Sequence, residues 1–269
     1  MDFAVKKYRT LFISDVHLGT KVSQSQNLHR YLATVEVEKL YLLGDFADIS
    51  NMRRHFFWDK HHNALIRHIF KMVKHGVEVV YIPGNHDKEL RDFAGMDFAG
   101  IKIKLQDIHT THDGRRFLLL HGDKFDGVLN EKLLFLYTFG DRCYDLALLL
   151  SKYLNCVLAL FGRQWSLSKY LKSKVKNVLK FINDFETLVI REARTHGVDG
   201  VICGHIHTPV IRKLEGLLYA NCGCWTESNS AVAELPDGTL ELINLSPQEQ
   251  FNTVKKNAEK DKKHQKACA

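Results

Sequence analysis

The chain has 269 residues, of which 45% are hydrophobic and 26% are charged, so it can bury a sizeable core and is not expected to be disordered throughout. Its formal net charge of +7 is local, because seven basic and no acidic residues lie between Leu146 and Asn183 and account for the whole excess. Six cysteines without regular spacing, and a first segment without the order of a secretory signal, predict a cytoplasmic protein with reduced thiols.

The first half of the chain alternates predicted strands and helices, the pattern of a largely parallel sheet. Apolar runs predict strands at residues 8–19, 39–43 and 79–82, and amphipathic segments predict helices at 27–35 and 63–75. Each of the three strands runs into polar residues, namely Asp15 and His17, then Asp45, then Asn85, His86 and Asp87. Because open α/β sheets place their ligands at the carboxyl ends of strands, these residues are candidates for a functional site.

The second half is predicted to begin with a β-hairpin, in which strands at 101–108 and 116–121 are joined across residues 112–114. Residues 126–195 are predicted to be helical, with an amphipathic stripe formed by Val175, Val178, Leu179, Ile182, Phe185 and Val189. Strands resume at 200–203 and 217–221, and a last hairpin covers 231–245. We therefore divide the chain into a core (1–125 and 196–247), a helical insertion (126–195) and a Lys-rich tail (248–269).

Seven oxygen and nitrogen donors follow five of the predicted strands, and none of them is a thiolate: Asp15, His17, Asp45, Asn85, His121, His205 and His207. Two divalent cations need about this many ligands if one carboxylate bridges them and water fills the open positions. Asp45 is the predicted bridge, since it lies between the first pair and Asn85 in the chain. Mn²⁺, Fe²⁺ and Zn²⁺ all suit these donors. Two metals about 3.5–4 Å apart generate hydroxide at neutral pH and clamp a phosphoryl group, which predicts hydrolysis of a phosphorus ester or anhydride.

His86 is a predicted catalytic residue, because it adjoins a predicted ligand and can either protonate the leaving oxygen or stabilise negative charge on the phosphoryl group. Asp48 is predicted to orient the His86 ring. A single Asp or His after a strand is commonly a turn or capping residue, but that explanation does not account for seven suitable donors at five strand ends.

Five motifs together resemble the signature of the calcineurin-like metallophosphoesterases: Asp15-x-His17, Gly44-Asp45-x-x-Asp48, Gly84-Asn85-His86-Asp87, His121-Gly122-Asp123 and Gly204-His205-x-His207. The resemblance implies an α/β fold, a four-layer metallophosphoesterase sandwich in which two mixed β-sheets are flanked by helices, here with an α-helical insertion. It also implies that one metal is held by Asp15, His17, Asp45 and His207, and the other by Asp45, Asn85, His121 and His205. His86 would then lie near the leaving group, paired with Asp48.

Within that family the chain resembles the UDP-2,3-diacylglucosamine hydrolases, which cleave a nucleotide-sugar pyrophosphate in lipid A assembly. The likeness lies in residues 15–20, in Arg53-Arg54 with the aromatic run to Trp58, and in residues 165–168, 172–177 and 204–207. One departure is His86, which stands where the best-known members have Arg. This difference does not change the expected metal chemistry, but it affects which substrate is expected.

The resemblance implies a nucleotide-linked lipid or glycolipid substrate, cleaved to UMP and a lipid phosphate, with Mn²⁺ as the expected metal. It also implies an enzyme peripheral to the inner membrane, in contact with an anionic membrane surface. The insertion fits, because apolar helices with only basic charges suit an acyl-chain pocket or an anionic lipid surface. The alternative is that the insertion consists of ordinary core helices whose lysines face the solvent, which would give the same pattern of apolar and basic residues.

Four residues are candidates for substrate binding. Arg53 and Arg54 are expected near the second phosphate of a pyrophosphate, since the planar guanidinium suits phosphate oxygens, although solvated residues at a helix start remain the alternative. Trp165 and Lys172 are candidates through the resemblance. Two other functions stay open: a soluble phosphodiesterase or phosphatase acting on nucleotides or nucleic acid, and a non-catalytic scaffold with the phosphoesterase fold.

Overall fold

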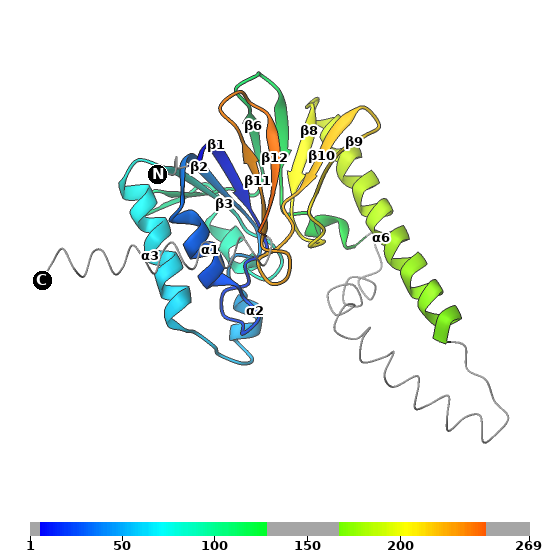
Figure 1. Ribbon diagram of the computed structural model, residues 1–269, viewed down its shortest axis with the longest axis horizontal. Coiled ribbons are helices and arrows are strands. Elements are labelled where there is room, and N and C mark those ends of the chain that lie inside the picture. The colour runs from blue at the N-terminus through cyan, green and yellow to red at the C-terminus, as the bar shows by residue number, and fades with distance from the viewer. Residues whose placement is uncertain (1–5, 128–166, 246–269) are drawn as a thin grey trace, which may run out of the picture. The chain divides into compact units, whose positions relative to one another are not determined.

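The computed structural model describes residues 6–127 and 167–245, and of residues 167–178 it describes the backbone only (Figure 1). The chain divides into two compact units, one made of residues 1–123 and 190–269 and the other of residues 124–189. The domain boundaries at residues 125 and 195 stay a prediction. Most of the predicted insertion lies outside the described residues, and its described part is dominated by the helix α6 (Leu167–Thr195).

The core unit contains two mixed β-sheets. The seven-stranded sheet has the order β12 (Leu240–Asn244), β11 (Ser230–Glu234), β1 (Lys6–Ile13), β2 (Val35–Leu43), β3 (Glu78–Ile82), β5 (Ile101–Ile103) and β4 (Asp97–Phe98). The five-stranded sheet has the order β6 (Asp107–Thr110), β7 (Arg116–Leu119), β8 (Gly200–Cys203), β10 (Leu217–Asn221) and β9 (Val210–Leu214). The strands β1, β2, β3 and β5 are parallel to one another, as are β7, β8 and β10, so their carboxyl ends meet at one edge of each sheet.

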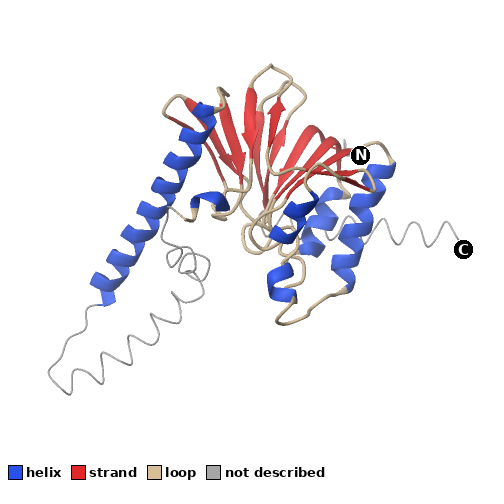
Figure 2. Ribbon diagram, turned by 180° about the vertical axis from the view of Figure 1, so that it is seen from behind, coloured by secondary structure: helices blue, strands red, loops and turns tan. Residues whose placement is uncertain are grey.

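Alternation along each strand explains the layers. In β2, Leu40 and Leu42 pack into a core under the helices α1 (Ser25–Leu32) and α3 (Lys60–Lys74), whereas Tyr41 and Leu43 pack into a second core that also contains residues of the five-stranded sheet. Figures 1 and 2 show α1 and α3 side by side on the outer face of the seven-stranded sheet. The expectation of two mixed sheets flanked by helices is confirmed.

Several short elements differ from the expectations. The segment 101–108 is not one strand, because β5 belongs to the seven-stranded sheet and β6 to the five-stranded sheet, and the chain passes between the sheets at residues 104–106. Alternating polarity cannot reveal this change, since both pieces are strands. The four-residue helix α2 (Ile49–Met52), the 3₁₀ helices η1 (Lys88–Phe93) and η2 (Asp123–Phe125), β4 and β9 were not predicted.

Helix α6 buries one face. Phe181, Phe185 and Val189 are fully or almost fully buried, whereas Leu179, which was placed in the predicted stripe, is 60% exposed. The stripe therefore turns away from Leu179 toward Phe181. No helix in the described ranges is both long enough and apolar enough to span a membrane.

A buried carboxylate joins the two sheets away from the strand ends that carry the candidate site. Glu234 in β11 is fully buried, and its Oε2 lies 2.7 Å from Nε2 of His109 in β6. The same oxygen accepts a hydrogen bond from the hydroxyl of Thr10 at 2.8 Å, and Oε1 accepts one from the backbone N–H of His112 at 2.8 Å. Because His109 and His112 belong to the five-stranded side, Glu234 holds the sheets together through polar contacts.

Candidate metal centre

The seven predicted donors lie on five loops that follow β1, β2, β3, β7 and β8, and the structure brings them together. Six of the seven, together with His86, form three groups whose potential ligand atoms lie within 4.8 Å of one another: Asp15, His17 and His207; His17, Asp45 and His86; and Asp45, His121 and His205. The amide oxygen of Asn85 lies 3.2 Å from Nε2 of His121. These clusters suit divalent metal ions, and the ligand assignment itself stays a prediction.

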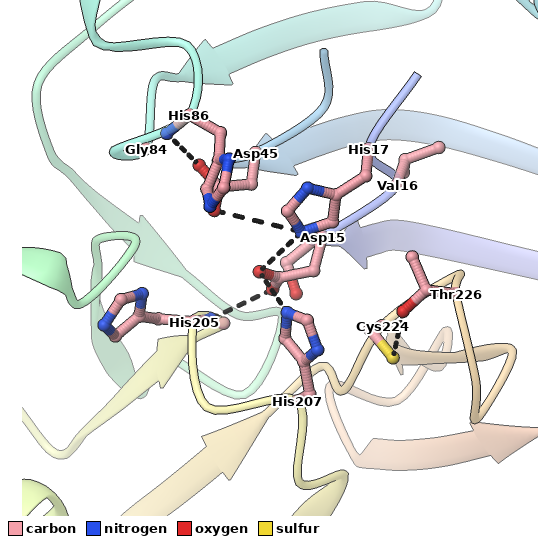
Figure 3. A network of polar contacts seen from close by, with 12 residues as sticks. Asp15, Val16, His17, Asp45, Gly84, His86, His205, His207, Cys224 and Thr226 are labelled. Carbon is pink, nitrogen blue, oxygen red and sulfur yellow. Dashed lines mark hydrogen bonds and ion pairs between the residues drawn. The ribbon is translucent and has the colours of Figure 1, made fainter. Parts of the chain in front are cut away.

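Asp15 is fully buried, and its two carboxylate oxygens face different neighbours. Oδ2 accepts a hydrogen bond from the backbone N–H of His205 at 2.9 Å, and Oδ1 lies 3.1 Å from Nε2 of His207. Nε2 of His17 approaches Oδ1 at 3.9 Å. Figure 3 shows Asp15 between these residues. A single carboxylate oxygen thus faces two imidazoles from separate loops, as a shared cation requires.

Asp45 lies between the two halves of the centre. Its Oδ2 is 3.3 Å from Nε2 of His121 and 4.0 Å from Nε2 of His17, and its Oδ1 accepts a hydrogen bond from the backbone N–H of His86 at 2.8 Å. Asp45 therefore belongs both to a group with His17 and to a group with His121. This shared position is the one that the predicted bridging carboxylate needs.

The ring of His17 provides a test of whether the residues fit a cation. Its Nε2 atom is buried and, among the described residues, has no hydrogen-bond partner. It faces Oδ1 of Asp15 at 3.9 Å and Oδ2 of Asp45 at 4.0 Å, too far for hydrogen bonds to either. A buried ring nitrogen left unsatisfied between two carboxylates is costly, and a divalent cation in that gap would satisfy all three atoms. The donor set therefore fits the predicted metals.

The backbone at the centre is unusual. Five of the seven donors have positive φ angles, namely Asp15 (54°), His17 (50°), Asp45 (50°), His205 (72°) and His207 (54°). Residues other than glycine rarely have positive φ angles. Each one that does costs conformational free energy, which the contacts of the surrounding fold must offset. Backbone strain is concentrated just after the ends of three strands. This indicates that these loops adopt their conformation because it positions the donor side chains, and not because it is the most stable local conformation.

Two glycines make room for the carboxylates. A Cβ atom on Gly84 would lie 2.3 Å from Oδ1 of Asp45, and one on Gly204 would lie 2.5 Å from Oδ2 of Asp15. The close approach of backbone to ligand explains why the motifs around Asn85 and His205 each begin with glycine.

Electrostatics couple the carboxylates and imidazoles. Burial alone would raise the pKa of Asp15, but the facing His207 ring outweighs it and lowers that pKa to about 2. Burial alone would lower the pKa of His121, but the Asp45 carboxylate raises it to about 10. Imidazoles must be neutral to bind a metal, so a cation that binds here has to displace these protons.

His86 and Asp48 form a pair, as the sequence predicts. Nδ1 of His86 lies 3.0 Å from Oδ1 of Asp48, which also caps α2 by accepting the backbone N–H of Asn51 at 2.8 Å. The other carboxylate oxygen of Asp48 lies 3.4 Å from Nδ1 of His17. The His86 side chain is 38% exposed, so it is within reach of a bound molecule. Asp48 therefore fixes two rings, one in the cluster and one at its edge.

We expect Asp48→Asn to move the alkaline limb of the pH–rate profile to lower pH. Burial acts to lower the pKa of His86, but the hydrogen bond to Asp48 and the negative charges of Asp45, Asp48 and Asp15 together outweigh it and raise that pKa. A general acid must be protonated, so its contribution is lost as the pH rises through its pKa, and removing the carboxylate brings that loss to lower pH. His86→Ala should slow hydrolysis by about 10²–10⁴-fold at neutral pH.

The measurement is kcat/KM against pH for wild type and both variants, with metal content determined for each. The exposed Asp92→Asn variant is the control and should follow the wild-type profile. If the limb in Asp48→Asn stays where it is in the wild type, another group is responsible for it.

Two residues at the site were given no role by the sequence reasoning. Asp87 is fully buried, and its carboxylate accepts hydrogen bonds from the backbone N–H groups of Gly84 at 2.6 Å and Phe46 at 2.8 Å and from the hydroxyl of Tyr81. It thereby ties the Asp45 loop to the Asn85 loop. Its place in the Gly84–Asp87 motif was the available signal.

Cys224 is the second such residue, and Figure 3 shows it with Thr226 in the polar network around His207. The hydroxyl of Thr226 donates to its Sγ at 3.3 Å. Burial alone would raise the pKa of Cys224, but His207 lowers it to about 6. The close pair Cys222-Gly-Cys224 was the only signal in the sequence.

Of the four predicted substrate-binding residues, the structure describes the side chains of Arg53 and Arg54 only. Arg53 follows α2, and its guanidinium forms an ion pair with Glu89 at 2.8 Å, while Arg54 is exposed on the same loop. Trp165 lies outside the described residues, and only the backbone of Lys172 is described, within α6. Their roles stay predictions.

Comparison with known proteins adds to this geometry. The family model for calcineurin-like phosphoesterases matches residues 8–209. The chain is 26% identical to the UDP-2,3-diacylglucosamine hydrolase of Blochmanniella pennsylvanica over 244 residues, covering 82% of this chain and 90% of that protein. It is 29% identical to the UDP-2,3-diacylglucosamine hydrolase of Cellvibrio japonicus over 215 residues, covering 76% and 84%. A solved structure described as a novel archaeal phosphodiesterase aligns with a TM-score of 0.44 and 13% identity, over 88% of this chain and 99% of that one.

Proposed function

Because the chain belongs to the calcineurin-like phosphoesterase family and is a metal-dependent hydrolase, we propose that it cleaves the phosphoanhydride of a nucleotide-linked lipid or glycolipid. The substrate class that we propose is UDP-2,3-diacylglucosamine, with UMP and a lipid phosphate as products. The relatives that carry this name cover most of the chain, including the region of the insertion.

The observation that carries the proposal is the convergence of seven hard and borderline donors around Asp45. We propose that Asp15, His17, Asp45 and His207 would hold one divalent cation, and Asp45, Asn85, His121 and His205 the other. Mn²⁺ is the proposed metal, with Fe²⁺ and Zn²⁺ also compatible with these donors. When bound, such a pair supplies Lewis acidity toward the phosphoryl oxygens and makes water a stronger nucleophile at neutral pH.

The residues of the chain supply the proton and the geometry. In the proposed reaction a water oxygen bonds to one phosphorus, and the bond from that phosphorus to the bridging oxygen breaks. Nε2 of His86 gives its proton to the leaving phosphate oxygen, while Asp48 holds Nδ1 at 3.0 Å and so directs Nε2 toward the substrate. The Asp15 and Asp45 carboxylates, each fixed by a backbone N–H, do not have to reorganise during the step.

We further propose that the enzyme works in the cytoplasm, at the anionic surface of the inner membrane. The basic charge without acidic counterpart between residues 146 and 183 supports this location, because such segments are attracted to anionic lipid. Arg53 and Arg54 would contact the second phosphate, and Trp165 and Lys172 the remainder of the substrate.

A panel of three substrates tests the proposal. With Mn²⁺ present, we expect kcat/KM for UDP-2,3-diacylglucosamine to exceed that for its de-acylated analogue and for an aryl phosphodiester by about 10²-fold or more, since buried acyl chains each contribute several methylene groups of binding energy. Chelation should abolish hydrolysis of all three, and added Mn²⁺ should restore it. Equal rates on the acylated and de-acylated compounds would refute the lipid substrate.

His86 favours a second candidate, a phosphodiesterase or phosphatase acting on a soluble ester such as a nucleotide. The histidine follows the Asn of the third motif, as in most phosphoesterases, whereas the best-known hydrolases of lipid A assembly have Arg at that position. Hydrolysis confined to the aryl diester and to nucleotides would select this candidate. A non-catalytic scaffold would hydrolyse none of these compounds with any of the three metals.

A further inference from the structure

An apolar cavity of about 400 Å³ lies on the outer face of the seven-stranded sheet. Its floor contains Leu42 and Tyr81, which point outward from β2 and β3, and one wall is formed by Ile66 and Phe70 of α3. The opposite wall includes Leu90 of η1 and Phe98 of β4. The cavity exists because the crossover from β3 to β5 contains the short helix η1 in place of a full α-helix, so among the described residues no α-helix packs over this part of the sheet.

The polar groups around the cavity are engaged elsewhere. Among the described residues that line it, Asp97 is the only charged one, and its Oδ1 accepts a hydrogen bond from the backbone N–H of Gly100 at 2.6 Å. The Tyr81 hydroxyl donates to Asp87. An occupant therefore meets hydrocarbon almost everywhere, and the volume lies within the range of ordinary small-molecule sites.

The mouth of the cavity has the character of a surface that contacts lipid. Phe93 is 47% exposed, Met96 58% and Phe98 67%, which is unusual for three large apolar side chains within six residues. On α3, Arg67 and Lys74 are exposed and lie next around the helix from Ile66 and Phe70. Within the described ranges neither forms an ion pair, so both are available to an anionic headgroup.

The cavity is separate from the metal centre but shares its loops. Leu18 and Phe46, the residues that follow His17 and Asp45, line it, and they are joined by a hydrogen bond from the Leu18 N–H to the Phe46 carbonyl at 2.9 Å. The side chains of the donors and those of the cavity thus leave the same loops in different directions. A molecule in the cavity would not occupy the site of hydrolysis.

We propose that this cavity holds one acyl chain of a membrane phospholipid, with Phe93, Met96 and Phe98 at the bilayer surface. A flexible alkyl chain matches an almost wholly apolar lining, and the exposed apolar side chains at the mouth, with Arg67 and Lys74 on the neighbouring helix, match the boundary between acyl chains and headgroups. The inference goes beyond the proposed function. It puts a membrane contact on the core rather than on the insertion, and it does not require the substrate to be a lipid.

The test uses a dansyl-labelled C11 fatty acid as a probe on the full-length protein. We expect one probe per chain, displaced by unlabelled fatty acids whose affinity rises about fourfold for each added methylene until the cavity is full. Ile66→Trp fills the cavity and should weaken probe binding about tenfold or more. Asp45→Asn should bind the probe as wild type does, which separates this inference from the proposed function.

Vesicles of phosphatidylethanolamine and phosphatidylglycerol give the second measurement. Met96→Asp should reduce co-sedimentation with them, whereas Leu105→Asp is the matched control, because Leu105 is 59% exposed, close to the 58% of Met96, and does not line the cavity. Both sites are on the surface, so the variants are expected to fold, and thermal unfolding verifies this. Equal loss of vesicle binding in the two variants would overturn the proposal.

Three other results would also overturn it. Probe binding unchanged in Ile66→Trp would place the alkyl site elsewhere. A wild-type dimer that Phe98→Asp converts to a monomer, without probe binding, would make the cavity an interface between copies of the chain. A raised KM for the acylated substrate in Ile66→Trp, with unchanged vesicle binding, would assign the cavity to the chain of the substrate itself.

Discussion

Asp45→Asn is expected to reduce kcat/KM by at least about 10³-fold while the protein remains folded. The reason is the shared position of Asp45: its Oδ2 faces both His17 and His121, at 4.0 and 3.3 Å, so an amide in its place removes the negative charge from both halves of the proposed centre. Loss of one ordinary ligand would affect one half only. Metal content, measured on the purified variant, should fall as well.

The matched control is again Asp92→Asn, an exposed aspartate in η1. Circular dichroism and thermal unfolding establish that the Asp45 variant keeps its fold, which is needed because Asp45 also accepts the backbone N–H of His86. Turnover within about tenfold of the wild type would remove Asp45 from the bridging role, since several kcal/mol of charge stabilisation cannot be lost at so small a cost in rate.

Glu234→Ala is expected to lower the free energy of unfolding by about 3–5 kcal/mol at pH 7, the range found when one partner of a buried polar pair is removed. The carboxylate is fully buried and serves His109, Thr10 and the N–H of His112, so its loss leaves all three without their acceptor. Urea unfolding followed by tryptophan fluorescence measures the effect. The control is Glu241→Ala, whose carboxylate is 40% exposed and pairs with Lys6, and which should change stability by less than about 1 kcal/mol.

The effect of Glu234→Ala on the free energy of unfolding should also depend on pH. Burial acts to raise the pKa of Glu234, but the hydrogen bonds from His109, Thr10 and the backbone N–H of His112 together outweigh it and lower that pKa below its ordinary value of 4.5. A carboxyl group whose pKa is depressed by folding stabilises the protein above its unfolded pKa and loses that contribution as the pH falls through its folded pKa. The difference between wild type and Glu234→Ala should therefore be full near pH 7 and shrink below pH 4.5. A difference that is constant down to pH 3 would contradict the assignment.

Much of the centre was accessible from the sequence, because parallel strands bring their carboxyl ends to one edge. An Asp or His just past an apolar run is therefore near others like it: six of the seven donors lie in the clusters, and Asn85 contacts one of them, His121. The geometry that makes them a site was not accessible. Asp15 and His205 have a left-handed backbone, and Asp87 accepts a hydrogen bond from the N–H of Phe46 in another loop. These features depend on contacts between loops about 40 to 190 residues apart, which no local pattern encodes.

The fold shows the same division. The apolar run at residues 39–43 correctly predicted a strand, but the pattern of residues 101–108 could not reveal that this segment changes sheets, because both sheets impose the same period. The cavity under η1 was equally hidden. Its apolar residues are individually unremarkable in the sequence, and only the absence of a long helix after β3 exposes them together.

The order in which the donors occur along the chain has a consequence for biosynthesis. The loops with Asp15, Asp45 and Asn85 leave the ribosome early, whereas His205 and His207 follow only after the whole of α6 has been made. Oδ2 of the Asp15 carboxylate is meanwhile without the N–H of His205. A nascent chain therefore carries five of the seven proposed donors before His205 and His207 are available. We expect the proposed centre to be complete only after residue 207 has left the ribosome.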